Sequence, residues 1–148
     1  MDGRQLMYTD VAPRAGWLRL AEDRSDDQIM LWELLAVALG LWTFLPRLRG
    51  RVCRVWTDNA GGEGALRKGA AAAVDHNRIV HAAWLLAAQE GFGLRIERVD
   101  THSNISDLPS REEYQLLSRL GAAWWDPQLP SELGHPDTWG RLAALGWE

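Results

Sequence analysis

The spacing of apolar residues along the chain predicts strands and helices in alternation. Alternating or β-branched residues predict strands, at 4–10, 17–20, 52–57 and 94–99. Apolar residues that recur every three or four positions predict helices, at 28–45, 75–92 and 111–122. The glycine-interrupted stretch 60–73 reads as a weak helix or a loop. This order favours an α/β fold with a partly parallel sheet, whose ligands gather at the carboxyl ends of its strands.

Local signals mark several element boundaries. Pro13 would turn the chain between the first two strands, so that they pair back as a hairpin. Ser25 and Gln28 have the spacing of a capping box that would open the first long helix, and Pro46 would end that helix. Gly91 stands where the second long helix must stop.

The apolar run from Ile29 to Leu45 also has to be weighed as a membrane span. It is at the short end of what crosses a bilayer, and it contains Glu33, Gly40 and Thr43. We therefore expect a helix buried in a protein core, and no membrane span.

The composition fits one folded domain inside the cell. With 148 residues, 47% of them hydrophobic, the chain can bury a core of ordinary size. Cys53 is the only cysteine, so no internal disulfide can form, and residues 1–10 are too polar and acidic for a targeting signal. We expect an intracellular protein with a folded domain at 1–120 and a proline- and tryptophan-rich tail at 121–148.

The charge restricts how this chain would bind nucleic acid. The formal net charge is −4, whereas a protein that coats nucleic acid without specificity is usually strongly basic. Any such binding should therefore be local and assisted by a metal ion. Four arginines crowd one corner, where they would either meet phosphates or form a solvated turn: Arg47, Arg49, Arg51 and Arg54.

Glu33 is the most informative acid. Its helical neighbours at three and four positions are all apolar: Ile29, Met30, Ala36 and Val37. A carboxylate on such a stripe costs several kcal/mol unless it is neutralised, paired or bound to a metal ion. In the alternative reading, Glu33 lies near the helix start and reaches solvent or interacts with the helix dipole.

Three aspartates stand beside predicted elements. Asp10 and Asp58 each follow a threonine at the end of a predicted strand, so adjacent parallel strands would bring their carboxylates together. Repulsion between them would be severe without a divalent cation. Asp107 precedes the third helix, where a helix dipole favours any acid. Asp10 alone would equally well open the turn before Pro13.

The four acids lie in four motifs, YTDVAPRAGW, LWELLAVALGLWTF, VCRVWTDNAGGEGAL and THSNISDLPSR. These motifs resemble the ribonuclease H-like superfamily, most closely the ribonuclease H domains of retrotransposon reverse transcriptases, including DIRS-like elements. The match runs from about Gln5 to Tyr114. It places the family's acids and its supporting polar residues on Asp10, Glu33, Asp58 and Asp107, and on Asn59, Asn104 and Arg111.

This resemblance implies a fold and an activity. The fold is a mixed sheet flanked by helices, with an antiparallel meander of three strands and two later strands parallel to the first. Here the interval between Asp10 and Glu33 is short, so we expect a trimmed meander. The activity is hydrolysis of the RNA strand of an RNA/DNA hybrid, with two Mg²⁺ ions, or Mn²⁺ in their place, held by the four acids. His102 lies where some members keep a mobile histidine, and a solvated loop histidine is the alternative.

A second hypothesis is a domesticated, catalytically silent copy of the fold that serves as an interaction or scaffold subunit. The short meander, the acidic net charge and the tryptophan-rich tail favour it. A protein partner would then bind through Trp124, Trp125, Trp139 and Trp147. Those tryptophans would otherwise form a lid on the core of the domain itself.

Overall fold

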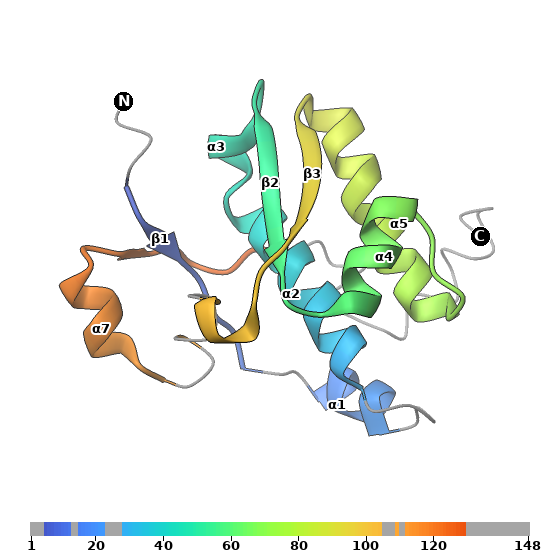
Figure 1. Cartoon of the computed structure of the whole chain (residues 1–148), viewed down its shortest axis with the longest axis horizontal. Helices are drawn as coiled ribbons and strands as arrows, with labels where there is room; N and C mark the ends of the chain where they lie inside the picture. The colour runs from blue at the N-terminus through green and yellow to red at the C-terminus, as the bar shows by residue number, and fades with distance from the viewer. Residues whose placement is uncertain (1–4, 13–14, 23–27, 105–108, 110–111, 130–148) are drawn as a thin grey trace.

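The computed structural model describes residues 5–12, 15–22, 28–104, 109 and 112–129, which form a mixed α/β fold (Figure 1). The elements follow in the order β1 (Met7–Tyr8), α1 (Ala15–Glu22), α2 (Ile29–Thr43), α3 (Leu45–Leu48), β2 (Val52–Thr57), α4 (Ala60–Lys68), α5 (Val74–Glu90), β3 (Gly93–Arg98), the 3-10 helix η1 (Thr101–Ser103), α7 (Tyr114–Arg119) and β4 (Ala123–Trp124). The α/β class expected from the sequence is therefore confirmed.

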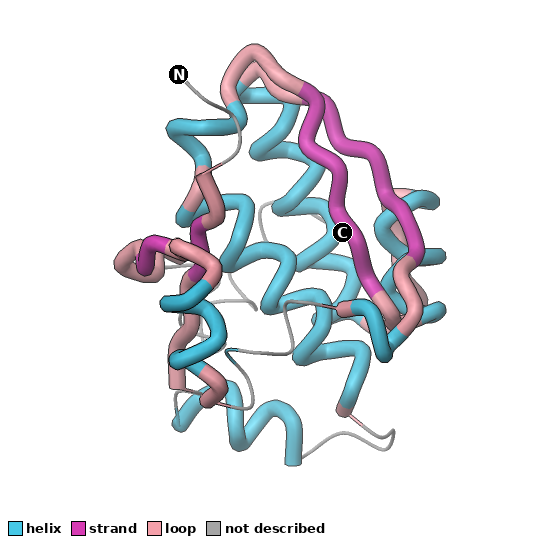
Figure 2. Tube along the Cα trace, turned by 60° about the vertical axis from the view of Figure 1, so that its left-hand side comes forward, coloured by secondary structure: helices cyan, strands magenta, loops and turns pink. Residues whose placement is uncertain are grey.

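The strands form two separate parallel pairs. β2 pairs with β3 from Val52 opposite Gly93 to Thr57 opposite Arg98, and β1 pairs with β4. Figure 2 shows β2 and β3 running side by side over the long helices. Backbone bonds extend the larger pair at both ends, because Gly93 N–H donates to Arg51 O at 2.9 Å and Val99 N–H donates to Thr57 O at 3.0 Å. The strands predicted at 52–57 and 94–99 are thus confirmed.

The main core forms around α2. This helix buries Leu31, Leu34, Leu35 and Ala38 on one face. They pack in one cluster with residues of α4, α5 and β3, namely Ala65, Leu66, Ile79, Val80 and Ile96. The helices predicted at 28–45 and 75–92 are confirmed as α2 and α5. None of the described helices combines the length and the apolarity that a membrane crossing requires.

The expected antiparallel meander is the main correction. The described strands contain no antiparallel pair, and the predicted second strand lies in a helix, α1. Trp17 and Ala21 of α1 are both buried in the main core, while Leu18 between them is exposed. A strand that buried these two residues would also bury Arg19, because strand side chains alternate, whereas a helix buries residues four apart without that cost.

Two predicted helix boundaries also differ from the structure. Gln28 is the N-cap of α2 with a left-handed φ of 67° and no side-chain cap bond, and Ser25 lies outside the described residues. α2 ends at Thr43, and Pro46 lies in the first turn of α3. Proline suits that place because its missing N–H would have no helical partner there. Gly91 ends α5 with a φ of 71°, as predicted.

The chain after α7 returns to the fold. β4 lies beside β1, and Gln128 N–H donates to Thr43 Oγ1 at the end of α2, at 3.0 Å. The Trp125 ring meets Phe44 edge-on, with 5.7 Å between centroids, and the Arg47 guanidinium lies 5.7 Å from the same indole. Trp139 and Trp147, from the predicted tail, lie outside the described residues.

We expect Leu34→Ala to lower the free energy of unfolding by about 2–5 kcal/mol, since it opens a cavity in the main core. Leu34 is 1% exposed, whereas Leu116 on α7 is 42% exposed and makes a matched control. Leu116→Ala should cost less than about 1 kcal/mol. Urea denaturation of the two variants measures the difference, and equal losses would contradict the placement of this core.

Candidate functional site

Asp58 directly follows β2, at the carboxyl end of the parallel pair. The backbone around it is held on both sides. Asn59 N–H donates to the buried Thr57 Oγ1 at 3.2 Å, and Asn59 Oδ1 accepts from Gly62 N–H at 2.7 Å, as the N-cap of α4. These bonds fix where the strand turns into the helix, because a capping side chain replaces a missing helical acceptor. The half-buried Asp58 is therefore anchored through its neighbours.

Glu33 lies in the second turn of α2 and lines a cleft between that helix and β2. The cleft has a volume of about 240 Å³, and its walls are mostly apolar, including Val37, Cys53 and Val55. Burial raises the pKa of the Cys53 thiol, which disfavours its thiolate form. The predicted apolar stripe around Glu33 is only partly enclosed, since Ile29 and Ala36 are exposed.

The elements that carry Glu33 and Asp58 meet at Gly61. A Cβ atom placed on Gly61 would lie 3.1 Å from Met30 Sδ in α2 and 3.3 Å from Asn59 Oδ1. Real Cβ atoms rarely come that close to other groups. The absence of a side chain at this position therefore lets the first turns of α2 and α4 approach each other.

Asp10 is held by two side chains from distant parts of the chain. The Tyr114 hydroxyl donates to Asp10 Oδ2 at 2.6 Å, and the Trp124 indole N–H donates to Oδ1 at 3.0 Å. Next to it, Thr9 Oγ1 donates to Trp125 O at 2.8 Å. The strand before Asp10 is β1, which pairs with β4 and not with β2. We had expected Asp10 and Asp58 to end adjacent parallel strands. They do not, because β1 pairs with β4 and β2 pairs with β3.

The remaining predicted residues follow β3. His102 lies in η1, where its side chain is exposed and its backbone N–H donates to Asp100 Oδ1 at 3.3 Å. Asn104 ends the same 3-10 helix and is half-buried. Asp107 and Arg111 lie outside the described residues.

A Mg²⁺ site requires several oxygen ligands around one point. Within the described ranges, no group of three or more histidine, cysteine, aspartate or glutamate side chains is placed to hold a metal ion. Asp10, Glu33 and Asp58 as arranged here therefore do not fit a metal cage by themselves.

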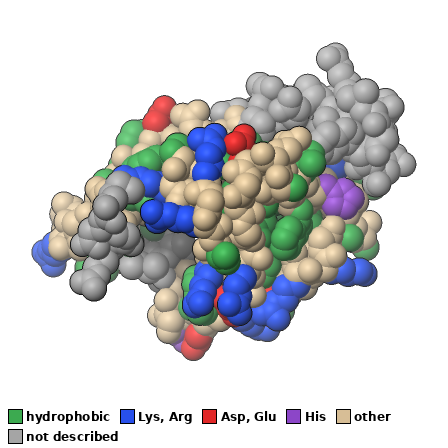
Figure 3. Space-filling view, turned by 90° about the horizontal axis from the view of Figure 1, so that it is seen from above, with side chains coloured by type: hydrophobic (Ala, Val, Ile, Leu, Met, Phe, Trp, Pro, Cys, Tyr) green, Lys and Arg blue, Asp and Glu red, His purple; other side chains and the backbone are tan. Residues whose placement is uncertain are grey.

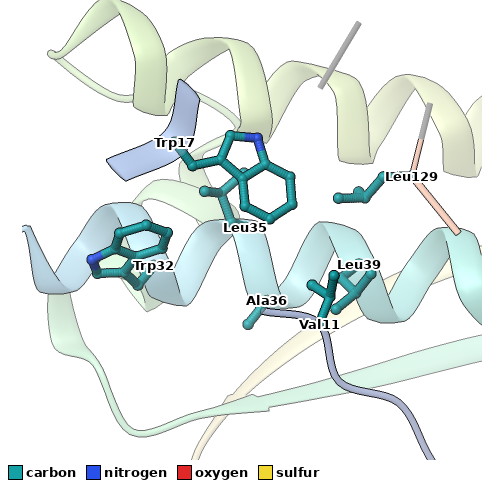
Figure 4. Close-up of a pocket in the computed structure, with 7 residues that line it drawn as sticks. All are labelled: Val11, Trp17, Trp32, Leu35, Ala36, Leu39 and Leu129. Atoms are coloured by element: carbon teal, nitrogen blue, oxygen red, sulfur yellow. The ribbon is translucent and has the colours of Figure 1, made fainter. Parts of the chain in front are cut away.

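A second, smaller pocket lies against a neighbouring face of α2, and Ala36 lines both pockets. It is almost entirely apolar, with a volume of about 120 Å³. Its lining comes from α1, α2 and two connecting segments, and consists of Val11, Trp17, Trp32, Leu35, Ala36, Leu39 and Leu129 (Figure 4). No charged or polar side chain lines it, so it has the character of a packing defect between elements and not of a catalytic centre.

Sequence patterns did not indicate the partners of Asp10. Tyr114 and Trp124 are 104 and 114 positions away, and neither belongs to a recognisable motif with it. The hydrogen bond to Asp10, with smaller contributions from desolvation and neighbouring charges, raises the pKa of Tyr114 to about 12. This value is above the ordinary tyrosine pKa of about 10, so the pairing stabilises the fold below about pH 10 and is lost as the pH rises through about 12.

We expect Asp10→Asn to lower the pKa of Tyr114 from about 12 toward the ordinary value of about 10, because the charged acceptor is gone. Titration of the tyrosinate absorbance measures this in a Tyr8→Phe background, which leaves one tyrosine. Glu112→Gln is the matched control, since Glu112 contributes less than Asp10 to the shift. An unchanged midpoint in Asp10→Asn would show that the 2.6 Å contact does not form in solution.

Comparisons of the chain with protein-family models, with curated proteins and with solved structures find no match. The resemblance to the ribonuclease H-like superfamily therefore rests on the four sequence motifs. The candidate site is therefore defined by the residues and contacts of this chain, without support from a related protein.

Proposed function

We propose that the chain is a ribonuclease H-type nuclease derived from a retroelement, which hydrolyses the RNA strand of RNA/DNA hybrids with Mg²⁺ as cofactor. Asp10, Glu33, Asp58 and Asp107 are its proposed metal ligands. Asn59, His102, Asn104 and Arg111 are the proposed supporting residues. Intracellular localisation is part of the same proposal.

The observation that carries this proposal is the position of Asp58. It lies at the carboxyl end of a parallel strand pair, beside a helix N-cap, which is where open α/β sheets bind ligands. Two further features support it. Glu33 lines a cleft against the same strand, and the first turns of α2 and α4 touch at Gly61. The positive end of the α4 dipole also favours negative groups near Asp58.

A second candidate function is a catalytically silent interaction module. The specific observation in its favour is that both Asp10 oxygens accept hydrogen bonds from side chains of the same protein. The partner in that case would be a protein. Exposed apolar side chains on α7, at its C-cap and on β4 offer it a surface, namely Tyr114, Leu116, Leu120 and Trp124.

We expect the full chain to cleave the RNA strand of an end-labelled RNA/DNA hybrid in Mg²⁺, and Asp58→Asn to lower the rate about a hundredfold or more. Loss of groups that merely orient a metal ligand typically costs 10- to 100-fold, and loss of a ligand should cost at least that much. Gel analysis of single-turnover cleavage measures the rate. EDTA should abolish it.

Asp126→Asn is the matched control, because it makes the same chemical change outside the candidate site. Its cleavage rate should equal that of the unmodified chain. A folded chain that cleaves no hybrid in Mg²⁺ or Mn²⁺ would refute the nuclease and leave the interaction module. Equal losses in both variants would instead show that Asp58 has no special role.

A further inference from the structure

The outward side of the β2–β3 pair carries a small basic and aromatic surface. Along β2, Cys53, Val55 and Thr57 turn toward the helices and are more buried, while the residues between them are exposed. The parallel register continues this surface onto β3. We call it the outer sheet face, and it consists of Val52, Arg54, Trp56, Gly93, Arg95 and Glu97.

Trp56 is the last residue of β2 that belongs to the outer sheet face, and it lies opposite Glu97 of β3. Its side chain is 54% exposed, although tryptophan is usually well covered in a folded protein. Val52, two positions before Arg54 on the same side, is 62% exposed. The described fold therefore leaves a large flat ring open to solvent on a rigid strand.

Two arginines face each other across this surface. Arg54 is directly opposite Arg95 in the register, and adjacent strands lie about 4.8 Å apart. Like charges opposite each other on one face destabilise a sheet. Arg95 is only partly compensated, by Glu97 at 3.8 Å, and Arg54 makes no ion pair within the described ranges. An anion between the two guanidinium groups would relieve this repulsion.

The surroundings add to the positive charge. Arg51 precedes β2 and is exposed, whereas Arg98 shares the face of Thr57 in the register and lies 3.9 Å from Glu63 Oε2. In Figure 3, Lys and Arg side chains gather along the lower edge of the view, on the side that carries β2 and β3. This local concentration contrasts with the net charge of −4 of the whole chain. The outer sheet face is thus suited to a ligand with repeated negative charges.

We propose that the outer sheet face binds single-stranded nucleic acid, with phosphates on Arg54 and Arg95 and a base stacked on Trp56. One guanidinium group can bind two phosphate oxygens through parallel hydrogen bonds. An exposed aromatic ring on a sheet is a platform on which an unpaired base stacks. A duplex keeps its bases stacked inside, so it cannot use Trp56 in this way. Trp56 also lines the cleft that Glu33 lines, but the proposal assigns no contact to Glu33 or to the other proposed metal ligands and does not depend on the proposed function.

Fluorescence anisotropy with labelled oligouridylate and oligothymidylate tests the proposal, in EDTA so that no metal-dependent cleavage contributes. We expect Trp56→Ala to weaken binding about tenfold, as for other base-stacking rings. The double variant Arg54→Gln/Arg95→Gln should reduce the slope of log K against log salt by about 1.4, which is about 0.7 for each lost phosphate contact with a single strand.

Three controls make the result specific. Arg119→Gln removes the same charge from α7 and should leave the affinity and the salt slope unchanged. Arg54→Lys keeps the charge and should retain most of the salt slope. Circular dichroism establishes that each variant is folded.

The proposal is overturned if the unmodified chain binds neither oligonucleotide. It is equally overturned if Trp56→Ala and the double arginine variant bind as well as Arg119→Gln does, because the site would then lie elsewhere. Displacement of the oligonucleotide by oligoglutamate at similar affinity would overturn it in favour of an acidic protein partner.

Discussion

Burial of one face of α2 is the interaction on which the other parts of this structure depend. Leu31, Leu34, Leu35 and Ala38 form the centre of the main core, and α1, α4, α5 and β3 all contribute side chains that pack against them. A parallel pair of only two strands has no stability of its own in water. Because α2 and α5 cover one face of β2 and β3, the pair persists, and the positions of Glu33 on α2 and of Asp58 after β2 are fixed with it.

The sequence patterns predicted the elements that local physics determines. β2 is rich in β-branched and aromatic residues, α5 repeats apolar residues at helical spacing, and Gly91 adopts the left-handed conformation that ends α5. α1 was predicted wrongly because Trp17 and Ala21 are compatible with one face of either a helix or a strand. β1 and β4 contain two residues each, and pairing Met7 with Ala123 is a non-local event that no local pattern specifies.

The residues of the candidate site likewise fall into those that local sequence patterns predicted and those that they did not. The position of Asp58 after a buried strand, and the cap that Asn59 provides, follow from neighbouring residues. The partners of Asp10 do not, because they come from the far end of the described chain. Whether the four acids converge stays a prediction, since Asp107 lies outside the described residues. The outer sheet face could have been found from the alternation of Arg54 and Trp56 with Cys53 and Val55.

Gly61 has a consequence that extends beyond its own contacts. It carries no functional group, yet Met30 of α2 lies against it, so Gly61 is a point of contact between α2 and α4. Glu33 is one turn further along α2 and Asp58 immediately precedes the α4 cap, so a side chain at this position would require Met30, or the elements that carry the two carboxylates, to shift by a few tenths of an ångström. The close approach of the two elements that carry these acids thus depends on a methyl group that the chain lacks.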